Sequence, residues 1–432
     1  MNTRPRLLSA IILTALVLCA AAPGGFSLRS GRVASGGRPA LAAAPQLPLT
    51  APRLPVDAPL VQPANLVYLG AFRVPQGDSQ GCNWSTGEHC FTYAGVFGYN
   101  PGRSSLFFSG HPWVGGVGEV SIPDTISLDE TAAVLQDIAD LTDGAEVDPG
   151  EVNGQGPSAG LVYHERLVIS GSTYYDADYT QVNTHGVSGF DFSIPDDFQG
   201  WYRFDPALAA NPRSIGGYMA PIPAEWQALL GGPALTGNCC LSIISNSSAG
   251  PAATVFDPDQ VGVADPIPGE TLLFYPLSDP LAPVDTQNTL FNLATHMGGI
   301  AFPSGTRSVL FFGRQGIGPY CYGTGEECND PADSSKGTHA YPYRHQVWAY
   351  DANDLLKVRS GEYQPWQVQP YAVWGLDEMN SDGSAGITGA VFDPASLRVY
   401  ITENYGDEPA VHVYQITISL AGGSVYLPLV SR

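Results

Sequence analysis

The sequence has few basic residues and few charged residues of any kind. It contains 19 Lys and Arg against 41 Asp and Glu, which gives a formal net charge of −22, and charged residues make up only 14% of the chain. An acidic surface repels phosphate backbones and anionic membranes. The composition therefore argues against nucleic acid as a partner.

The sequence also lacks the short motifs that identify several large enzyme classes. It has no P-loop, no Gly-x-Ser-x-Gly elbow and no cysteine spacing typical of a zinc site. Residues 176–179 and 329–335 offer oxygen ligands to calcium, but neither stretch matches an EF-hand loop. No cofactor is evident from the sequence. Calcium binding is possible in principle, but no motif supports it.

Long helical patterns are nearly absent, apart from a short one at 223–230, and the chain has a repeated β-hairpin instead. Each copy reads as a small residue, an apolar strand, a turn and a second apolar strand. The five copies span 94–111, 159–176, 250–259, 298–316 and 388–406. A hairpin unit repeated along one chain is typical of a β-propeller.

Further apolar segments complete each repeat. Third strands are expected at 117–123, 186–194, 271–277, 345–351 and 410–416, and fourth strands at 133–141, 214–222, 289–295 and 370–376. The last repeat lacks a fourth strand, and we expect 66–74 to supply it by pairing with the end of the chain. The sequence thus predicts an all-β, five-bladed β-propeller over residues 65–420, its ring closed by this N-terminal strand.

The blade count depends on a few segments that could be assigned differently. The third blade is the weakest, because 239–245 could be its first strand. Six or seven blades stay open if 124–158 or 196–238 hold further strands. A pair of β-sandwiches would explain the turns, but not the repeated hairpin or the displaced N-terminal strand.

The two ends of the chain carry features of an exported protein. Arg4 and Arg6 precede an apolar run and then small residues, the order found in a signal peptide, and this run is too short to favour a permanent membrane anchor. We assign 1–44 to the export segment, cleaved near 42–44 or just after the apolar run. Residues 45–64 are expected to be an extended, poorly ordered Pro-rich linker, and 421–432 a C-terminal tail. The sequence predicts a secreted or cell-surface protein, monomeric and without an integral membrane domain after signal removal.

Six of the seven cysteines lie outside the export segment, an even number that suits disulfide pairing. Cys82 with Cys90, and Cys321 with Cys328, are spaced to close small loops. Cys239 and Cys240 are adjacent, and a vicinal disulfide is the default expectation for them. Two free buried thiols are the alternative, which an oxidising compartment disfavours.

The propeller phasing brings one set of loops to one face. The connections before each first strand and after each second strand emerge together, and all three cysteine pairs fall in them. Loops gathered on a rigid scaffold are where binding sites concentrate. This face is therefore the candidate site.

Polar and aromatic residues follow several second strands and could share one pocket there. Tyrosines stack on the apolar faces of sugar rings, so the set suggests carbohydrate binding. The competing reading is that these side chains only satisfy the backbone of their loops. The candidate ligand-binding residues are His111, Trp113, Tyr174, Asp176, Arg314, Tyr320 and Tyr405.

Two catalytic schemes use residues of the same face. A lyase acting on an acidic polysaccharide needs a base, a tyrosine acid and an arginine, and the candidates are His339, Tyr341 and Arg344, with His185 and Tyr175. The acidity of the chain argues mildly against such a substrate. A glycoside hydrolase needs paired carboxylates, and the candidates are Asp176, Glu151, Asp382 and Glu403.

Several segments of the sequence also resemble segments of known proteins. The segments YLGAFRVP, GTRSVLFFGRQGIGPYCYG, GTHAYPYRHQVWAYDANDL and YYDADYTQVNTH are similar to those of a family of secreted bacterial propeller-like proteins, over about residues 66 to 418. This resemblance implies the fold and export but assigns no activity and no catalytic residues. The closing VYLPLVSR resembles a short C-terminal tail found on many exported bacterial proteins.

The sequence thus predicts an exported propeller that binds a carbohydrate or other extracellular ligand on its disulfide-braced loop face. Glycan cleavage by a lyase or hydrolase mechanism would add to this role. The alternative is a binding or surface-interaction module without catalysis. Whether the protein is an enzyme stays open at this level.

Overall fold

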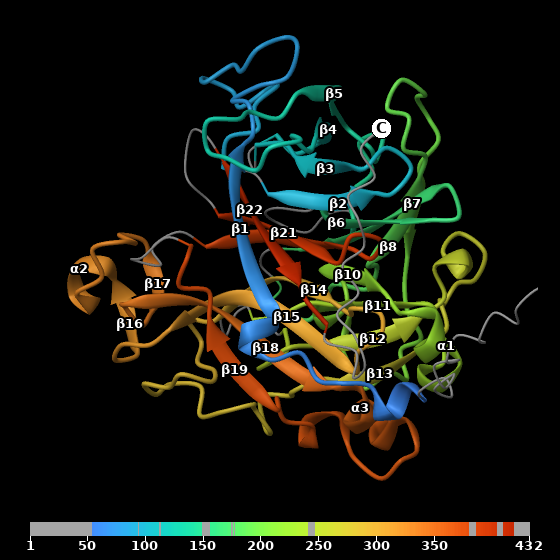
Figure 1. The fold of residues 1–432 in the computed structure, drawn as a ribbon, viewed down its shortest axis with the longest axis vertical. Helices are drawn as coiled ribbons and strands as arrows, with labels where there is room; N and C mark the ends of the chain where they lie inside the picture. The colour runs from blue at the N-terminus through green and yellow to red at the C-terminus, as the bar shows by residue number, and fades with distance from the viewer. Residues whose placement is uncertain are drawn as a thin grey trace, which may run out of the picture. The chain divides into compact units, whose positions relative to one another are not determined.

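The computed structural model describes residues 54–93, 95–111, 114–148, 156–173, 176, 178–240, 247–379, 386–403 and 409–418. All of them belong to the second of the two units into which the chain divides, Pro52–Arg432. This second unit is mostly β-structure (Figure 1). No helix among the described residues is long and apolar enough to cross a membrane.

Three sheets are four-stranded, antiparallel and built from consecutive strands. We call each such set of four strands a quartet. Quartet 1 consists of β2 (Val96–Asn100), β3 (Ser105–Ser109), β4 (Val117–Ser121) and β5 (Val134–Ala139). Quartet 2 consists of β6 (Gly156–Tyr163), β7 (Arg166–Ser172), β8 (His185–Ser188) and β9 (Gln199–Tyr202). Quartet 3 consists of β10 (Tyr218–Pro221), β11 (Ala234–Gly237), β12 (Ala253–Phe256) and β13 (Gly269–Leu273).

The remaining large sheet has eight strands and contains two further quartets. Quartet 4 consists of β14 (His296–Ala301), β15 (Ser308–Gly316), β18 (Tyr343–Asp351) and β19 (Ala372–Gly375). Quartet 5 consists of β20 (Ile387–Asp393), β21 (Arg398–Glu403), β22 (Ala410–Ile416) and β1 (Leu66–Arg73). The two halves join where β14 and β20 run parallel, at Gly299 opposite Ala390. A Cβ atom at Gly299 would lie 2.2 Å from the Ala390 carbonyl oxygen, so only glycine permits this approach.

The first strands of the five quartets contact one another in cyclic order. β2 contacts β6, β6 contacts β10, β10 contacts β14, β14 contacts β20, and β20 contacts β2. Their side chains are short or apolar near the contacts, which allows the strands to approach. This ring of first strands defines an axis for the described part of the chain.

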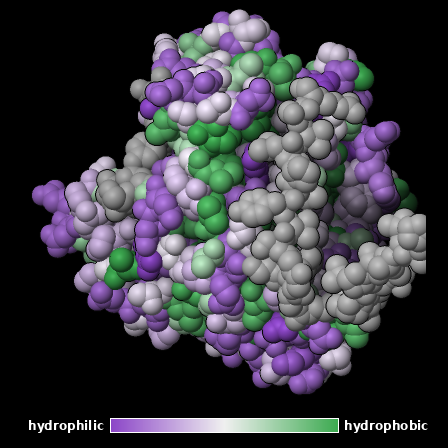
Figure 2. All heavy atoms as spheres, in the orientation of Figure 1, coloured by the Kyte–Doolittle hydropathy of each residue, from purple (hydrophilic) through white to green (hydrophobic). Residues whose placement is uncertain are grey.

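The N-terminal strand completes the last quartet as the sequence predicts. β1 pairs antiparallel with β22, from Leu66 opposite Ile416 to Arg73 opposite Ala410. Figure 1 shows the blue N-terminal strand alongside the red C-terminal one. β1 is the outer edge of its quartet, and Figure 2 shows a hydrophobic stripe over it, where Val67 and Leu69 are exposed.

The predicted phasing is right in quartets 1, 4 and 5 and wrong in the middle of the chain. Quartet 2 ends with β9, and the segment 214–222 that was expected to end it instead holds β10, the first strand of quartet 3. The hairpin expected at 250–259 is the third strand of quartet 3, and 289–295 forms no strand. The cause is that β9 and β11 are four-residue strands, too short to give a clear alternating pattern.

Helices and 3₁₀ turns are short and lie between strands. α1 (Ala224–Leu230) occupies the predicted position and ends at Gly231, whose φ is 94°. α3 (Ala352–Arg359) was not predicted, and Asp351 caps it by accepting from the Asn353 backbone N–H. The 3₁₀ turns are Pro55–Asp57, Pro63–Asn65, Pro212–Ser214, Pro258–Gln260 and Pro365–Gln367.

Residues 54–64 pack against quartet 4 although the sequence predicts a linker there. Val61 is buried, and its backbone N–H donates to the Ser308 hydroxyl. The Tyr371 hydroxyl donates to the Val61 carbonyl, and the Asn353 side chain donates to the Val56 carbonyl. The packed chain therefore begins before residue 65.

A small hairpin extends quartet 4 between its second and third strands. β16 (Cys321–Thr324) pairs with β17 (Lys336–His339), and α2 (Gly325–Cys328) lies between them. α2 begins at a capping box formed by Thr324 and Glu327. We call residues 317–342 the inserted hairpin.

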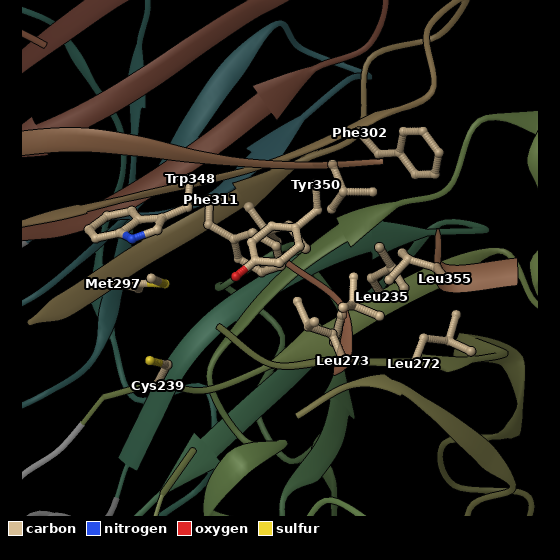
Figure 3. Close-up of a cluster of buried hydrophobic side chains, with 14 of the residues drawn as sticks. Leu235, Cys239, Leu272, Leu273, Met297, Phe302, Phe311, Trp348, Tyr350 and Leu355 are labelled. Atoms are coloured by element: carbon tan, nitrogen blue, oxygen red, sulfur yellow. The ribbon is translucent and has the colours of Figure 1, made fainter. Parts of the chain in front are cut away.

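The largest hydrophobic cluster lies between quartets 3 and 4. Figure 3 shows aromatic side chains of β15 and β18 facing leucines of quartet 3. Its buried members include Trp348, Phe311, Tyr350, Leu235, Leu272 and Leu273. Burial of aromatic and leucine side chains at this scale fixes the two quartets against each other.

Candidate functional site: a cavity on the axis

A cavity of about 200 Å³ lies where the first strands of all five quartets begin. We call it the axial cavity. Its wall takes residues from the starts of β2, β6, β10, β14 and β20 and from the ends of β7 and β11. Strand starts and second-strand ends of this kind belong to the loop face that the sequence predicts. The polar lining residues are Ser158, Ser172, Asn238, His296 and Thr388.

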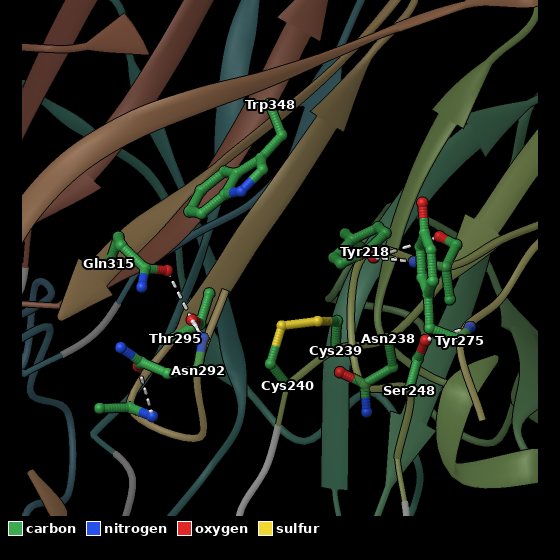
Figure 4. The surroundings of a disulfide bond; sticks show 12 residues. Tyr218, Asn238, Cys239, Cys240, Ser248, Tyr275, Asn292, Thr295, Gln315 and Trp348 are labelled. Atoms are coloured by element: carbon green, nitrogen blue, oxygen red, sulfur yellow. Dashed lines mark hydrogen bonds between the residues drawn. A yellow bond between two sulfur atoms is a disulfide. The ribbon is translucent and has the colours of Figure 1, made fainter. Parts of the chain in front are cut away.

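The vicinal disulfide forms part of this wall. Cys239 and Cys240 are joined directly after β11, and both are buried. Cys239 lines the axial cavity, and Figure 4 shows Asn238 beside the disulfide. The other predicted pairs, Cys82–Cys90 and Cys321–Cys328, are also formed. All three predicted disulfides are thus confirmed.

Asn238 is held in one orientation by two hydrogen bonds. Its backbone N–H donates to the Ser214 carbonyl at 2.8 Å, and its Nδ2 donates to the Arg213 carbonyl at 2.9 Å. Because a carbonyl oxygen only accepts, the amide nitrogen must face Arg213 and the Oδ1 atom must face away from it. Among the described residues, none donates a hydrogen bond to that oxygen.

Arg213 is a buried cation behind Asn238. Its Nη1 donates to the Thr173 hydroxyl at 2.9 Å and to Gln181 Oε1 at 3.1 Å. Burial lowers the pKa of Arg213 to about 10, and the charge of Asp176 opposes this shift. The guanidinium therefore stays charged at neutral pH and ties the loop after β7 to the segment that carries Asn238.

His296 opens the strand β14 and is neutral. Burial lowers its pKa to about 4, the nearby positive charge of Arg314 lowers it further, and a hydrogen bond to the Ile387 backbone opposes both. Arg314 stands opposite His296 in the β14–β15 register. The Nδ1 atom of His296 is buried and has no hydrogen-bond partner among the described residues.

Asp176 and Arg314, two predicted ligand-binding residues, lie behind the cavity wall. Asp176 is buried and accepts from the Thr180 backbone N–H and hydroxyl. Arg314 lies with its Cζ 4.2 Å from the centre of the Tyr343 ring. The charge of Arg314 acts on His296, which lines the cavity, and the charge of Asp176 acts on Arg213, which holds Asn238 from behind the wall.

His111 and Tyr320 lie away from the axial cavity. The backbone N–H of His111 donates to the Cys90 carbonyl, its ring packs edge-on against Tyr93, and burial lowers its pKa. Tyr320 lies in the inserted hairpin directly before β16, and partial burial raises its pKa. Neither residue lines the cavity.

The structure does not bring His339, Tyr341 and Arg344 together as a lyase site would require. His339 is 1% exposed, and its Nδ1 lies 2.8 Å from the Asp330 carboxylate. Arg344 pairs with Asp377 at the surface, at 3.2 Å. Tyr341 contacts the ring of Tyr343 edge-on.

His185 and Glu403 are buried inside the strands. His185 lies between the hydroxyls of Thr184 and Thr236, at 3.0 and 3.1 Å, and burial lowers its pKa to about 3. The carboxylate of Glu403 lies 3.0 Å from His345 Nδ1 and 3.1 Å from His412 Nε2. Neither His185 nor Glu403 lines the axial cavity.

The remaining candidates fall outside the described residues. They are Trp113, Tyr174, Tyr175, Tyr405, Glu151 and Asp382. Within the described part of the chain, no group of three or more His, Cys, Asp and Glu side chains is placed to hold a metal ion.

His296 and Asn238 are the lining residues that sequence reasoning missed. Both sit in loops assigned to the candidate face, 295–299 and 232–240. Their local sequences, THMGG and GNCC, are rich in glycine and cysteine and carry no chemical signature of their own. Only their positions could have pointed to them: His296 lies at the start of a first strand, and Asn238 directly follows a second strand.

Comparison with known proteins adds little to this picture. No family model and no curated protein matches the chain. Among solved structures, the chain is similar to a luciferin-regenerating enzyme, with a TM-score of 0.34 and 7% sequence identity, over 83% of this chain and 95% of that one. A likeness at this level carries no inference about fold or function.

Proposed function

We propose that the protein is an exported, five-bladed β-propeller that binds a small carbohydrate, or the end of a larger one, in the axial cavity. In this proposal each quartet is one blade. The cyclic contacts of the first strands and the pairing of β1 with β22 support the propeller. Three disulfides, together with the export features of residues 1–44, support an extracellular location.

The observation that carries the binding role is the composition of the cavity wall. All five first strands contribute to it, and hydroxyl, amide and imidazole groups alternate there with apolar side chains. A few converging polar groups in an otherwise apolar concavity are characteristic of small-molecule sites. At about 200 Å³ the cavity is smaller than the roughly 300–1,000 Å³ that drug-sized ligands occupy, so its ligand is small.

Binding without catalysis is the better supported of the two roles. A hydrolase needs two carboxyl groups about 5–10 Å apart around its substrate. Among the described residues that line the axial cavity there is no carboxylate, and His296 is the one titratable group besides Tyr218. A lyase needs a base, an acid and a cation within reach of one another. The described candidates for those roles, His339, Tyr341 and Arg344, contact other side chains and do not line the axial cavity.

A binding assay with a matched pair of variants tests the proposal. The mature chain would be titrated calorimetrically with neutral monosaccharides and short oligosaccharides, alongside an assay for their cleavage. Ser172→Phe fills the cavity and should abolish binding, whereas Ser278→Phe, at an exposed site, should leave it unchanged. Equal melting temperatures would show that both variants fold.

Three results would count against the proposal. Failure of every sugar to bind the wild-type chain would remove the carbohydrate assignment. Binding that survives Ser172→Phe would move the site elsewhere. Turnover of a bound glycan would replace the binding role with an enzymatic one.

A further inference from the structure

The described lining of the axial cavity carries no net charge at neutral pH. Its polar members are three hydroxyl groups, one amide and the imidazole of His296. The imidazole is kept neutral by its burial and by Arg314 behind it. An anionic group brought into this part of the cavity would lose water without meeting a cation on the wall.

The fixed amide of Asn238 supplies an acceptor at a defined place. One N–H of its Nδ2 donates to the Arg213 carbonyl, which turns the Oδ1 atom away from Arg213 and leaves it to accept from a ligand. An acceptor oxygen repels a carboxylate and attracts an O–H or N–H group. The polar groups that position it, Arg213 with Thr173 and Gln181, are themselves buried.

Hydroxyl groups on the wall of the same cavity add both donors and acceptors. The Ser158 and Ser172 oxygens lie 3.3 Å apart, so one hydroxyl donates to the other and the pair keeps one free donor. The rest of the wall is apolar and polarisable, with Tyr218, Met219 and Cys239. Thioethers, disulfides and aromatic rings pack well against C–H faces.

Together these features describe the ligand's chemistry. Resting on the proposed function, we infer that the axial cavity selects an uncharged sugar ring over the corresponding acidic sugar, and that Asn238 Oδ1 accepts a hydrogen bond from one of its hydroxyl groups. Asn238 is then a specificity-determining residue, and Arg213 is a positioning residue that acts through it. The net charge of −22 on the chain favours the same selection at longer range.

Matched neutral and acidic sugars test this selection directly. Calorimetric titration of the wild-type chain with D-glucose against D-glucuronate, and with D-galactose against D-galacturonate, should give affinity on the order of tenfold higher for the neutral member of at least one pair. Asn238→Ala should lower the affinity for that neutral sugar by about the same factor. Ser172→Lys places a cation in the cavity and should shift the preference toward the acidic sugar.

The outcomes separate this inference from the function on which it rests. Equal or tighter binding of the uronates by the wild-type chain overturns the inference and leaves carbohydrate binding in place. Undiminished affinity in a folded Asn238→Ala variant overturns the role of Asn238. Failure of both neutral and acidic sugars to bind removes the proposed function and the inference with it. If Asn238→Ala does not fold, the wild-type comparison and Ser172→Lys still decide the selection.

Discussion

The Asp330 carboxylate and the imidazole of His339 form a buried ion pair, 2.8 Å apart, inside the inserted hairpin. His339 Nε2 also lies 3.1 Å from the Ser335 carbonyl, which only accepts, so this nitrogen carries a proton. Asp330 accepts from the Tyr343 hydroxyl and from the Ala332 backbone N–H, which marks it as the ionised partner. Both ring nitrogens of His339 therefore donate, and a histidine in that state is not a base.

This pair predicts a loss of stability at alkaline pH. Burial lowers the pKa of His339, but the hydrogen bonds to Asp330 and Ser335 outweigh it and raise the pKa above 6.5. The stabilisation is fully present below the unfolded pKa and is lost as pH rises through the raised value. Urea unfolding between pH 5 and 9 should show this fall for wild type and not for His339→Gln.

The exposed His164, which pairs with Asp259 at the surface, provides the control. His164→Gln should keep the wild-type pH profile. An alkaline limb that persists unchanged in His339→Gln would contradict the ion pair as its source.

Because β1 closes the last quartet, substitutions at two of its positions should lower the free energy of unfolding by very different amounts. Phe72 is fully buried in a cluster with Val74 and Phe91, whereas Leu69 is 38% exposed on the same strand. Phe72→Ala should lower the free energy of unfolding by about 3–5 kcal/mol, and Leu69→Ala by less than about 1 kcal/mol. Chemical denaturation measures both. Similar costs at the two positions would show that β1 does not carry the burial described.

The disulfides predict effects of different kinds. Replacing Cys82 and Cys90 together with serine should lower the free energy of unfolding by about 2–3 kcal/mol, because the bond closes a loop of eight residues. Replacing Cys239 and Cys240 together with serine removes almost no loop entropy but alters the cavity wall. That variant should lose sugar affinity with a smaller loss of stability, as titration and denaturation would show. The reverse ranking would argue against a cavity role for Cys239.

Glu403 provides a test between the sequence-based hypothesis and the observed geometry. A catalytic carboxylate would be needed for turnover, whereas a carboxylate held between His345 and His412 supports the fold. Glu403→Gln should therefore lower the free energy of unfolding by about 1–3 kcal/mol and leave sugar affinity unchanged in the folded fraction. Glu130→Gln, at an exposed position, is the control. If Glu403→Gln lost sugar affinity without losing stability, Glu403 would have a role in the binding site after all.

Much of the architecture could be predicted because the sequence repeats one unit, two apolar segments joined by a short turn. β3 and β21 are second segments of this kind and are almost entirely buried, and the partner of β22 could be found by asking which repeat lacked a strand. Quartet 3 could not be phased in this way. Its strands are four or five residues long and are separated by long connections that include α1.

The individual site residues were much harder to predict than the face on which they lie. His339 and Glu403 looked like catalytic groups because of their side-chain chemistry, yet each is buried and held by partner side chains away from the cavity. Asn238 and His296 are important through orientation and environment, which depend on contacts across quartets that no local pattern records.

The pairing of β1 with β22 also sets an order of events during biosynthesis. Residues 66–73 are made early, but the strand that they pair with, Ala410–Ile416, is made after every other strand of the described residues. A fragment that ends before residue 410 leaves β1 without its partner and Phe72 without the part of its cluster that β22 supplies. The last quartet can therefore assemble only after residues 410–416 have been made, which delays the burial of β1 until then.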